Sequence, residues 1–138
     1  MIELGLGHGQ GLTQLKSIAE NEEISEKYLE QIIIALRAAG LVKSVRGAKG
    51  GYFLSREPKA ITVREIIEKL EGSLYPVDCG ENGNNCSRFE RCVSVDIWKM
   101  LGEKIYDTLE GISLASLVEK YKEKNPGFQE AKSATNKG

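Results

Sequence analysis

The chain has 138 residues, of which 41% are apolar and 28% are charged, the balance of a folded soluble domain. Nineteen basic and 20 acidic side chains give a net charge of −1, so the total charge indicates no class of partner. No apolar run approaches the roughly 20 residues that span a bilayer, and no signal-peptide pattern opens the chain. We therefore expect a soluble, cytoplasmic protein with no membrane partner.

The charge is unevenly distributed along the chain. Between Glu26 and Arg56 lie six basic and two acidic residues, which gives this segment +4 and leaves −5 for the rest. A basic segment in an acidic chain favours an anion-binding face, although surface charges also cluster to this degree by chance.

The amino-terminal third predicts a helix-turn-helix. Residues 2–6 suit the last turns of a helix that the glycines up to Gly11 break, and we expect further turns upstream. Thr13 is a candidate N-cap for a short helix, and Ser25 for a second one that stops at Gly40. The second helix carries apolar residues at three-and-four spacing, among them Tyr28.

Two short runs of β-forming residues follow, at 41–45 and 52–54, on either side of a glycine-rich turn at 46–51. Helix, turn, helix and a hairpin with a basic tip is the order of a winged helix. We predict a mainly α fold with a small β-hairpin wing, a winged helix-turn-helix followed by a long dimerisation helix.

The rest of the chain predicts three more helices and a tail. The capping box at Thr62 starts a helix that ends at Gly72 and turns Val63, Ile66, Ile67 and Leu70 inward. A long helix from 93 to 110 carries an apolar stripe suited to a partner or to an ordinary core. An amphipathic helix at 113–124 comes last. The predicted divisions are a DNA-binding domain (1–72), a cysteine-bearing loop (73–92), the dimerisation and C-terminal helices (93–124) and a disordered tail (125–138).

Eight residues are candidates for DNA contact. The first turns of a recognition helix face base edges in the major groove, and a glycine-rich hairpin tip can reach an adjacent groove or the backbone. The candidates are Lys27, Tyr28, Glu30 and Gln31 on the helix, and Arg46, Gly47, Lys49 and Gly50 at the tip. Any one of the helix residues can instead be a solvated surface residue, and Tyr28 fits the core better than a contact.

Three cysteines lie within fourteen residues as Cys79-x6-Cys86-x5-Cys92, on a loop rich in glycine and asparagine. Thiolates are soft ligands for iron–sulfur clusters, zinc or copper(I), and zinc ranks lower because no Cys-x-x-Cys pair is present. Catalysis is not expected: a cysteine nucleophile wants a histidine base, and the single histidine, His8, lies in a glycine-rich segment.

The segments SEKYLEQ (25–31), LR (36–37), AGLV (39–42), VRG (45–47) and GGY (50–52) resemble the Rrf2 family of bacterial winged-helix regulators. The resemblance extends over residues 2 to 122. It implies a homodimer formed through the long helix, bound to a partly palindromic operator in double-stranded DNA. In IscR-type members, residues at the positions of Glu30 and Arg46 take part in base readout, whereas Lys27 stands where IscR itself has serine. Relatives also carry further residues, some of them basic, before the position of Met1.

The same resemblance bears on the cysteines. IscR-type members carry three cysteines at nearly this spacing and bind an iron–sulfur cluster, whereas CymR-type members lack them. The resemblance therefore implies a cluster on Cys79, Cys86 and Cys92, with 2Fe–2S favoured over 4Fe–4S. The fourth ligand is open, because Val95 stands where IscR has histidine and His8 is a weak candidate. Glu81, Glu90 and Asp96 are oxygen donors with no better case. Such a cluster would be labile, and aerobic handling is expected to empty it.

Two functions are consistent with these features. The first is an IscR-type transcription regulator that senses iron–sulfur or redox status through the three cysteines. The alternative is a repressor of cysteine or sulfur metabolism genes that works as a thiol switch, or through a protein partner, without a cluster.

Overall fold

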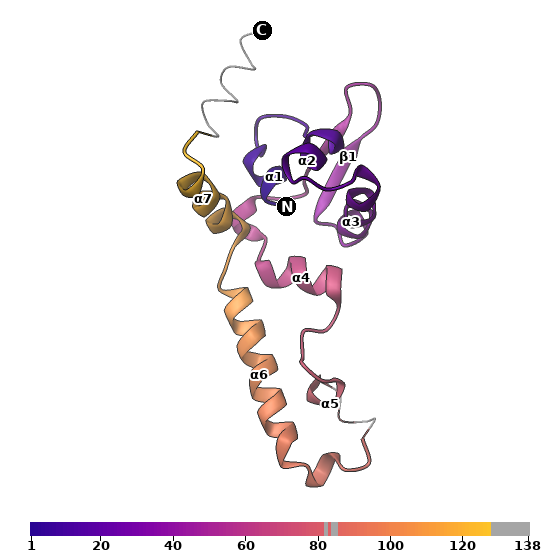
Figure 1. Ribbon diagram of the computed structural model, residues 1–138, viewed down its shortest axis with the longest axis vertical. Helices are drawn as coiled ribbons and strands as arrows, with labels where there is room; N and C mark the ends of the chain where they lie inside the picture. The colour runs from indigo at the N-terminus through magenta and orange to yellow at the C-terminus, as the bar shows by residue number, and fades with distance from the viewer. Residues whose placement is uncertain (82, 84–85, 128–138) are drawn as a thin grey trace. The chain divides into compact units, whose positions relative to one another are not determined.

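The computed structural model describes residues 1–81, 83 and 86–127. These residues are mainly helical with a two-stranded antiparallel hairpin, which confirms the predicted fold class. The chain divides into two compact units: unit 1 holds residues 1–61 and the described residues from Ser113 onward, and unit 2 holds Thr62–Ile112 (Figure 1). No helix within the described ranges combines the length and the apolar character that a membrane span requires. The predicted tail lies almost wholly outside the described residues.

Unit 1 is built around one apolar core. Its helical elements are α1 (Ile2–Leu6), α2 (Leu15–Asn21), α3 (Glu26–Ala38), the 3-10 turn η1 (Pro58–Ala60) and α7 (Leu114–Lys124). The largest of its fully buried side chains are Leu36, Leu41, Ile61 and Leu114. The chain leaves the unit at Ile61 and returns beside it, where the Leu114 N–H donates to the Ile61 carbonyl at 2.8 Å. α7 then packs against α1 and η1, which makes it part of this core.

The hairpin joins β1 (Val42–Val45) to β2 (Gly51–Leu54), with Val42 opposite Leu54 and Val45 opposite Gly51. Val42 and Leu54 are both buried, so the base of the hairpin belongs to the core of unit 1. Gly47 adopts a φ of +115°, a conformation that favours glycine, and the Gly50 N–H closes the turn on the Gly47 carbonyl at 2.9 Å.

The expectation that Thr13 caps α2 is wrong. The N-cap is Gln14, which makes no side-chain capping bond. Thr13 instead pairs with Tyr52 of the hairpin: its N–H donates to the Tyr52 carbonyl at 3.0 Å, and the Tyr52 N–H donates back at 2.8 Å. The main chain of Thr13 is thus extended as a partner of β2, which fastens the hairpin to the segment before α2.

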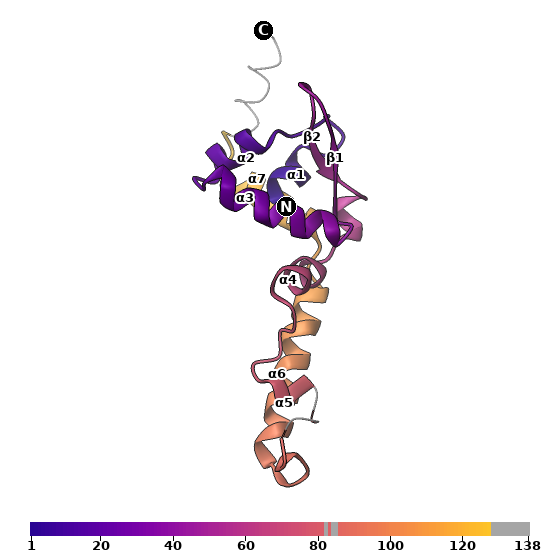
Figure 2. The same ribbon diagram turned by 90° about the vertical axis from the view of Figure 1, so that its right-hand side faces the viewer.

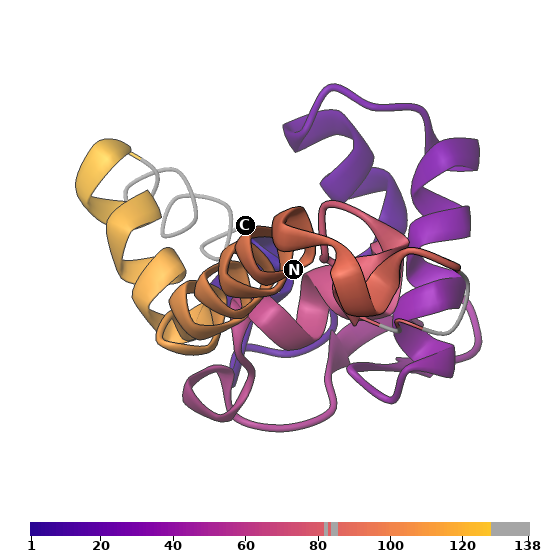
Figure 3. The same ribbon diagram turned by 90° about the horizontal axis from the view of Figure 1, so that it is seen from below.

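Unit 2 contains α4 (Val63–Glu71), α5 (Asp78–Glu81), the 3-10 turn η3 (Phe89–Arg91) and α6 (Val93–Glu110). The predicted cap is confirmed, since the Thr62 Oγ1 accepts a hydrogen bond from the Glu65 N–H at 3.2 Å. α4 ends before Gly72, whose φ is +81°. α5 packs against α6, as Figures 2 and 3 show from two sides.

The predicted inward face of α4 is wrong in part. No residue of α4 is buried, and Leu70 is 37% exposed. The physical reason is that unit 2 provides few buried apolar side chains for α4 to pack against. Val95 and Tyr106 are its only buried apolar residues among those that the structure describes. An amphipathic helix needs apolar neighbours to cover its stripe, and here the neighbours cover it incompletely.

Candidate nucleic-acid interface and cysteine segment

α3 has two chemically different faces. Leu29, Ile33 and Leu36 are buried in the core, where α3 packs against α2 (Figure 3). The helix begins at the predicted cap, because the Ser25 Oγ accepts a hydrogen bond from the Tyr28 N–H at 3.2 Å. The opposite face carries the exposed side chains of Lys27, Tyr28, Glu30, Gln31 and Ile34. The first turns of α3 therefore present donors, acceptors and an aromatic ring to solvent.

The expectation that Tyr28 belongs to the core is wrong. Its side chain is 60% exposed, whereas the next residue, Leu29, is 6% exposed. A helix rotates by about 100° per residue, so the buried stripe centred on Leu29 and Ile33 leaves Tyr28 on its edge. The ring is thus free to meet a partner, and Tyr28 stays a candidate for DNA contact.

The hairpin tip presents backbone and positive charge to solvent. Arg46, Gly47 and Lys49 are exposed, and Gly50 is half-buried. A Cβ at Gly50 would overlap the main chain of Val45 and Gly47, so this close turn requires a glycine. The structure places all eight candidate DNA contacts in unit 1, on α3 and at this tip.

Five cations around this face make no ion pair with the residues that the structure describes. In the described ranges of the chain, Lys27, Arg37, Lys43, Arg46 and Lys49 make no ion pair. These five cations therefore remain available to an external anion. A positive patch of this kind attracts nucleic acid over long range.

The three cysteines lie in unit 2 as free thiols. Cys79 belongs to α5 and is half-buried, Cys86 is exposed, and Cys92 is the half-buried N-cap of α6. Three thiolates suit an iron–sulfur cluster by their donor type. Their arrangement does not fit one, because the described residues contain no group of three His, Cys, Asp or Glu side chains that could hold a metal ion.

The candidates for a fourth ligand are not gathered either. His8 belongs to unit 1, where its Nε2 lies 3.2 Å from the Glu57 Oε1. Val95 is buried, and Glu81, Glu90 and Asp96 are exposed.

A close contact at the start of the cysteine segment was not predicted from the sequence. The Tyr75 ring lies on Gly102 of α6, so closely that a Cβ at Gly102 would overlap it. The same ring lies 5.4 Å from the Tyr106 ring, centroid to centroid, and the Leu74 N–H donates to the Tyr106 hydroxyl at 3.1 Å. This contact fastens the start of the cysteine segment to α6. A lone glycine inside a long amphipathic helix was the available signal.

α6 also exposes an apolar stripe. Five side chains on it are between 36% and 80% exposed: Val93, Ile97, Met100, Leu101 and Ile105. Their spacing of three, four and eight residues places them along one side of the helix. Apolar side chains gathered along one exposed side of a helix are typical of interaction surfaces.

A helix-turn-helix with a polar outer face on its second helix, followed by a hairpin with a basic tip, defines a winged-helix DNA-binding protein. The family model of Rrf2, described as an iron-dependent transcriptional regulator, matches residues 1–120. The chain belongs to the Rrf2 family. It is accordingly a transcription regulator and not an enzyme.

Relatives of two kinds are similar to this chain. The HTH-type transcriptional regulator CymR of Bacillus subtilis is 44% identical over 117 residues, which cover 85% of this chain and 80% of the relative. The HTH-type transcriptional regulator IscR of Erwinia tasmaniensis is 40% identical over 119 residues, covering 86% and 71%. The solved structure of T. potens IscR has a TM-score of 0.70 at 43% identity and covers 88% of this chain and 80% of its own. Identity therefore does not separate the IscR type, which the cysteines favour, from the CymR type.

Proposed function

We propose that the chain binds an operator in double-stranded DNA as a homodimer and responds to iron–sulfur or redox status through Cys79, Cys86 and Cys92. The observation that carries the DNA-binding part is the polar outer face of α3 beside a hairpin tip whose cations, Arg46 and Lys49, make no ion pair with the residues that the structure describes. Both belong to unit 1, so one duplex can meet them together.

The side chains divide between base reading and anchoring. On α3, the Glu30 carboxylate accepts from cytosine N4, the Gln31 amide pairs with adenine, and Lys27 reaches guanine or a phosphate. Tyr28 adds apolar contact at the groove edge. At the tip, Arg46 and Lys49 enter the adjacent minor groove or meet its phosphates, while Gly47 and Gly50 let the main chain come close.

In vitro selection from a library of random duplexes tests this assignment. The wild-type chain should enrich a two-part site, and Glu30→Ala should relax the preference at one position per half-site by about 1–3 kcal/mol. Glu119→Ala, which removes an exposed carboxylate from α7, is the matched control and should select the wild-type site. A chain that enriches no sequence, or an E30A variant with unchanged preferences, contradicts the assignment.

The homodimer rests on the exposed stripe of α6. The stripe lies on an 18-residue helix, about 27 Å long, and a second copy of the same stripe is its simplest complement. Two copies of unit 1 would then meet two half-sites, which is why dimeric regulators bind partly palindromic operators.

The sensing part rests on three free thiols within one segment of unit 2. These cysteines supply the soft donors that an iron–sulfur cluster takes, although among the described residues no three His, Cys, Asp or Glu side chains are gathered to hold a metal ion. The segment leads directly into α6, because Cys92 is its N-cap. A change of state at the thiols is therefore communicated to the helix that carries the proposed dimer stripe.

Purification without oxygen, with iron and sulfide counted per chain, tests the cluster. Both elements together with visible charge-transfer bands support it. Equal counts of iron and sulfide fit a 2Fe–2S and a 4Fe–4S cluster alike, so the amount of each per loaded chain distinguishes them. The variant with all three cysteines changed to serine should lose iron, sulfide and any dependence of DNA affinity on them. A colourless, iron-free wild-type chain contradicts the cluster.

The second candidate is a thiol switch without a cluster. The absence of a ligand group among the described residues favours it, as does the exposure of Cys86. It predicts a reversible disulfide under mild oxidation. This is seen as a mass loss of about 2 Da on the intact chain and as two cysteines that no longer react with an alkylating reagent. Oxidation that leaves three alkylatable thiols and unchanged DNA affinity would exclude it.

A further inference from the structure

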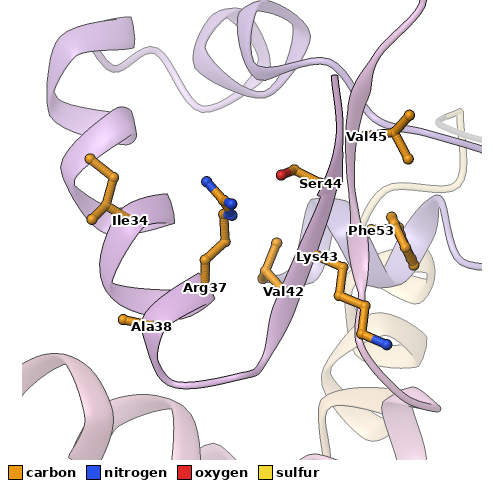
Figure 4. A pocket seen from close by; sticks show the side chains of 8 residues that line it. All are labelled: Ile34, Arg37, Ala38, Val42, Lys43, Ser44, Val45 and Phe53. Carbon is orange, nitrogen blue, oxygen red and sulfur yellow. The ribbon is translucent and has the colours of Figure 1, made fainter. Parts of the chain in front are cut away.

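A groove runs between the second half of α3 and the first strand of the hairpin, both in unit 1 (Figure 4). Its volume is about 570 Å³. The lining side chains are Ile34, Arg37 and Ala38 from α3, Val42, Lys43, Ser44 and Val45 from β1, and Phe53 from β2. None of the eight candidate DNA contacts lines it, so the predicted interface leaves this groove unexplained.

The groove combines positive charge with apolar surface. Arg37 lines it from α3 and Lys43 from β1, and no acidic residue is among its lining. Figure 4 shows the Arg37 side chain directed toward Ser44, and the Lys43 side chain on the face of β1 that is turned away from α3. Neither cation has an anionic partner in the part of the chain that the structure describes. Ile34 and Val45 are 58% and 48% exposed, which leaves apolar surface on both sides of the charges. An anionic chain with apolar segments between its charges complements such a lining.

The geometry of the DNA duplex identifies this anionic ligand. In B-DNA the wall between the major groove and the neighbouring minor groove is one sugar–phosphate backbone. If α3 occupies the major groove and the hairpin tip reaches the adjacent minor groove, the backbone between them has to pass between α3 and the hairpin. The groove with Arg37 and Lys43 lies in that position.

We propose that this groove holds the sugar–phosphate backbone that separates the two DNA grooves, with Arg37 on a phosphate inside the groove, Lys43 on a phosphate of the same strand beyond the edge of β1, and Ile34 against the deoxyribose. This inference rests on the proposed function and extends it. The Arg37 guanidinium can grip a phosphate with two parallel N–H donors, whereas Lys43 acts as a point charge. These contacts read no sequence and fix the register in which the base-reading face of α3 meets the duplex.

The salt dependence of binding provides the test, because each phosphate contact releases counterions. The probe is a mixed-sequence duplex of about 30 base pairs, titrated at several KCl concentrations. The double variant Arg37→Ala, Lys43→Ala should lower the slope of log affinity against log salt by about 1.8 per bound protomer, which weakens binding about 30-fold at about 0.15 M salt. The charge-conserving variant Arg37→Lys, Lys43→Arg should keep the wild-type slope within about 0.5.

Two further variants make the test specific. Lys120→Ala, Lys122→Ala removes the same charge from α7 and should change the slope by less than half as much. Ile34→Glu places a carboxylate at an exposed groove position that is already helical, and it should weaken binding of the same duplex without loss of folding. Circular dichroism of each variant checks the fold.

The outcomes separate this inference from the function on which it rests. Wild-type slope and affinity in the Arg37, Lys43 double variant, together with weaker binding by Arg46→Ala, overturn the groove and leave the proposed interface standing. The groove would then suit an acidic protein segment instead. An equal loss in the α7 control also overturns the groove. Unchanged binding in both the double variant and R46A overturns the groove and the proposed DNA face together.

Discussion

Units 1 and 2 differ in how far each completes its own core. Of the buried apolar residues that the structure describes, thirteen belong to unit 1 and two, Val95 and Tyr106, to unit 2. Large exposed apolar residues show the reverse bias, with six of ten in unit 2 although it is the smaller unit. Burial of apolar surface is the main stabilising term in folding. Unit 1 therefore completes an apolar core from its own residues, whereas unit 2 leaves many of its apolar side chains exposed.

The variant with Ile97→Asp and Leu101→Asp tests this comparison in the middle of the exposed α6 stripe. Both residues are exposed in the single chain, so the free energy of unfolding of a monomer should change by no more than about 0.5 kcal/mol per site. Two carboxylates buried between copies should cost at least about 3 kcal/mol, a rise of about 100-fold in the dimer dissociation constant. Sedimentation equilibrium measures this constant.

Lys104→Asp is the matched control for that variant, since it places the same side chain at an exposed polar position of α6. It should leave the dimer within about threefold of wild type. If the variant with Ile97→Asp and Leu101→Asp sedimented as the wild-type dimer, the α6 stripe would not be the surface between copies.

Gly102→Ala sharpens the comparison, because the contact of Gly102 with Tyr75 is among the few close-packed places in unit 2. Helix propensity alone predicts that alanine stabilises α6 by about 1 kcal/mol. The overlap with the Tyr75 ring predicts the opposite sign, a loss of about 1–3 kcal/mol in the free energy of unfolding. Urea denaturation decides between the signs, and the same substitution in a Tyr75→Ala background should become stabilising.

The helix caps give a smaller effect that still distinguishes the units. Ser25→Ala and Thr62→Ala each remove one capping bond and should cost about 1 kcal/mol. α3 is held by three buried side chains and should stay formed, whereas α4 has none and should fray at its first turn. Amide hydrogen exchange should rise at 63–66 in T62A and little at 26–29 in S25A. Equal increases of hydrogen exchange in both helices would show that buried side chains do not stabilise α3 more than α4.

Features that neighbouring residues encode could be predicted from the sequence. The caps at Ser25 and Thr62, the two hairpin strands and the span of α6 all depend on residues close together in the chain, and the structure confirms them. The pairing of Thr13 with Tyr52 was missed because it joins segments 39 residues apart, and no local pattern records it. The packing of α7 against α1 is also a long-range contact that no local pattern predicts.

The candidate sites show the same limit. Charge and glycine content alone placed Arg46 and Lys49 at an exposed tip, because a hairpin tip is local. The spacing of the cysteines indicated their chemistry, yet spacing does not determine whether three side chains converge. The Arg37 and Lys43 groove was overlooked since it is formed by the packing of α3 against β1, which the sequence does not state.

Tyr28→Ala has the smallest expected effect on stability and tests the outer face of unit 1. The ring is 60% exposed, so its removal should change the free energy of unfolding by no more than about 0.5 kcal/mol. Loss of its contact at the edge of the DNA major groove should weaken operator binding by about 1 kcal/mol, or about fivefold. Fluorescence anisotropy resolves a difference of this size. Tyr28→Phe keeps the ring and should recover most of this loss if the contact is apolar. If Y28A lowered the free energy of unfolding yet bound DNA as tightly as wild type, Tyr28 would stabilise the core of unit 1 and would not be a DNA contact.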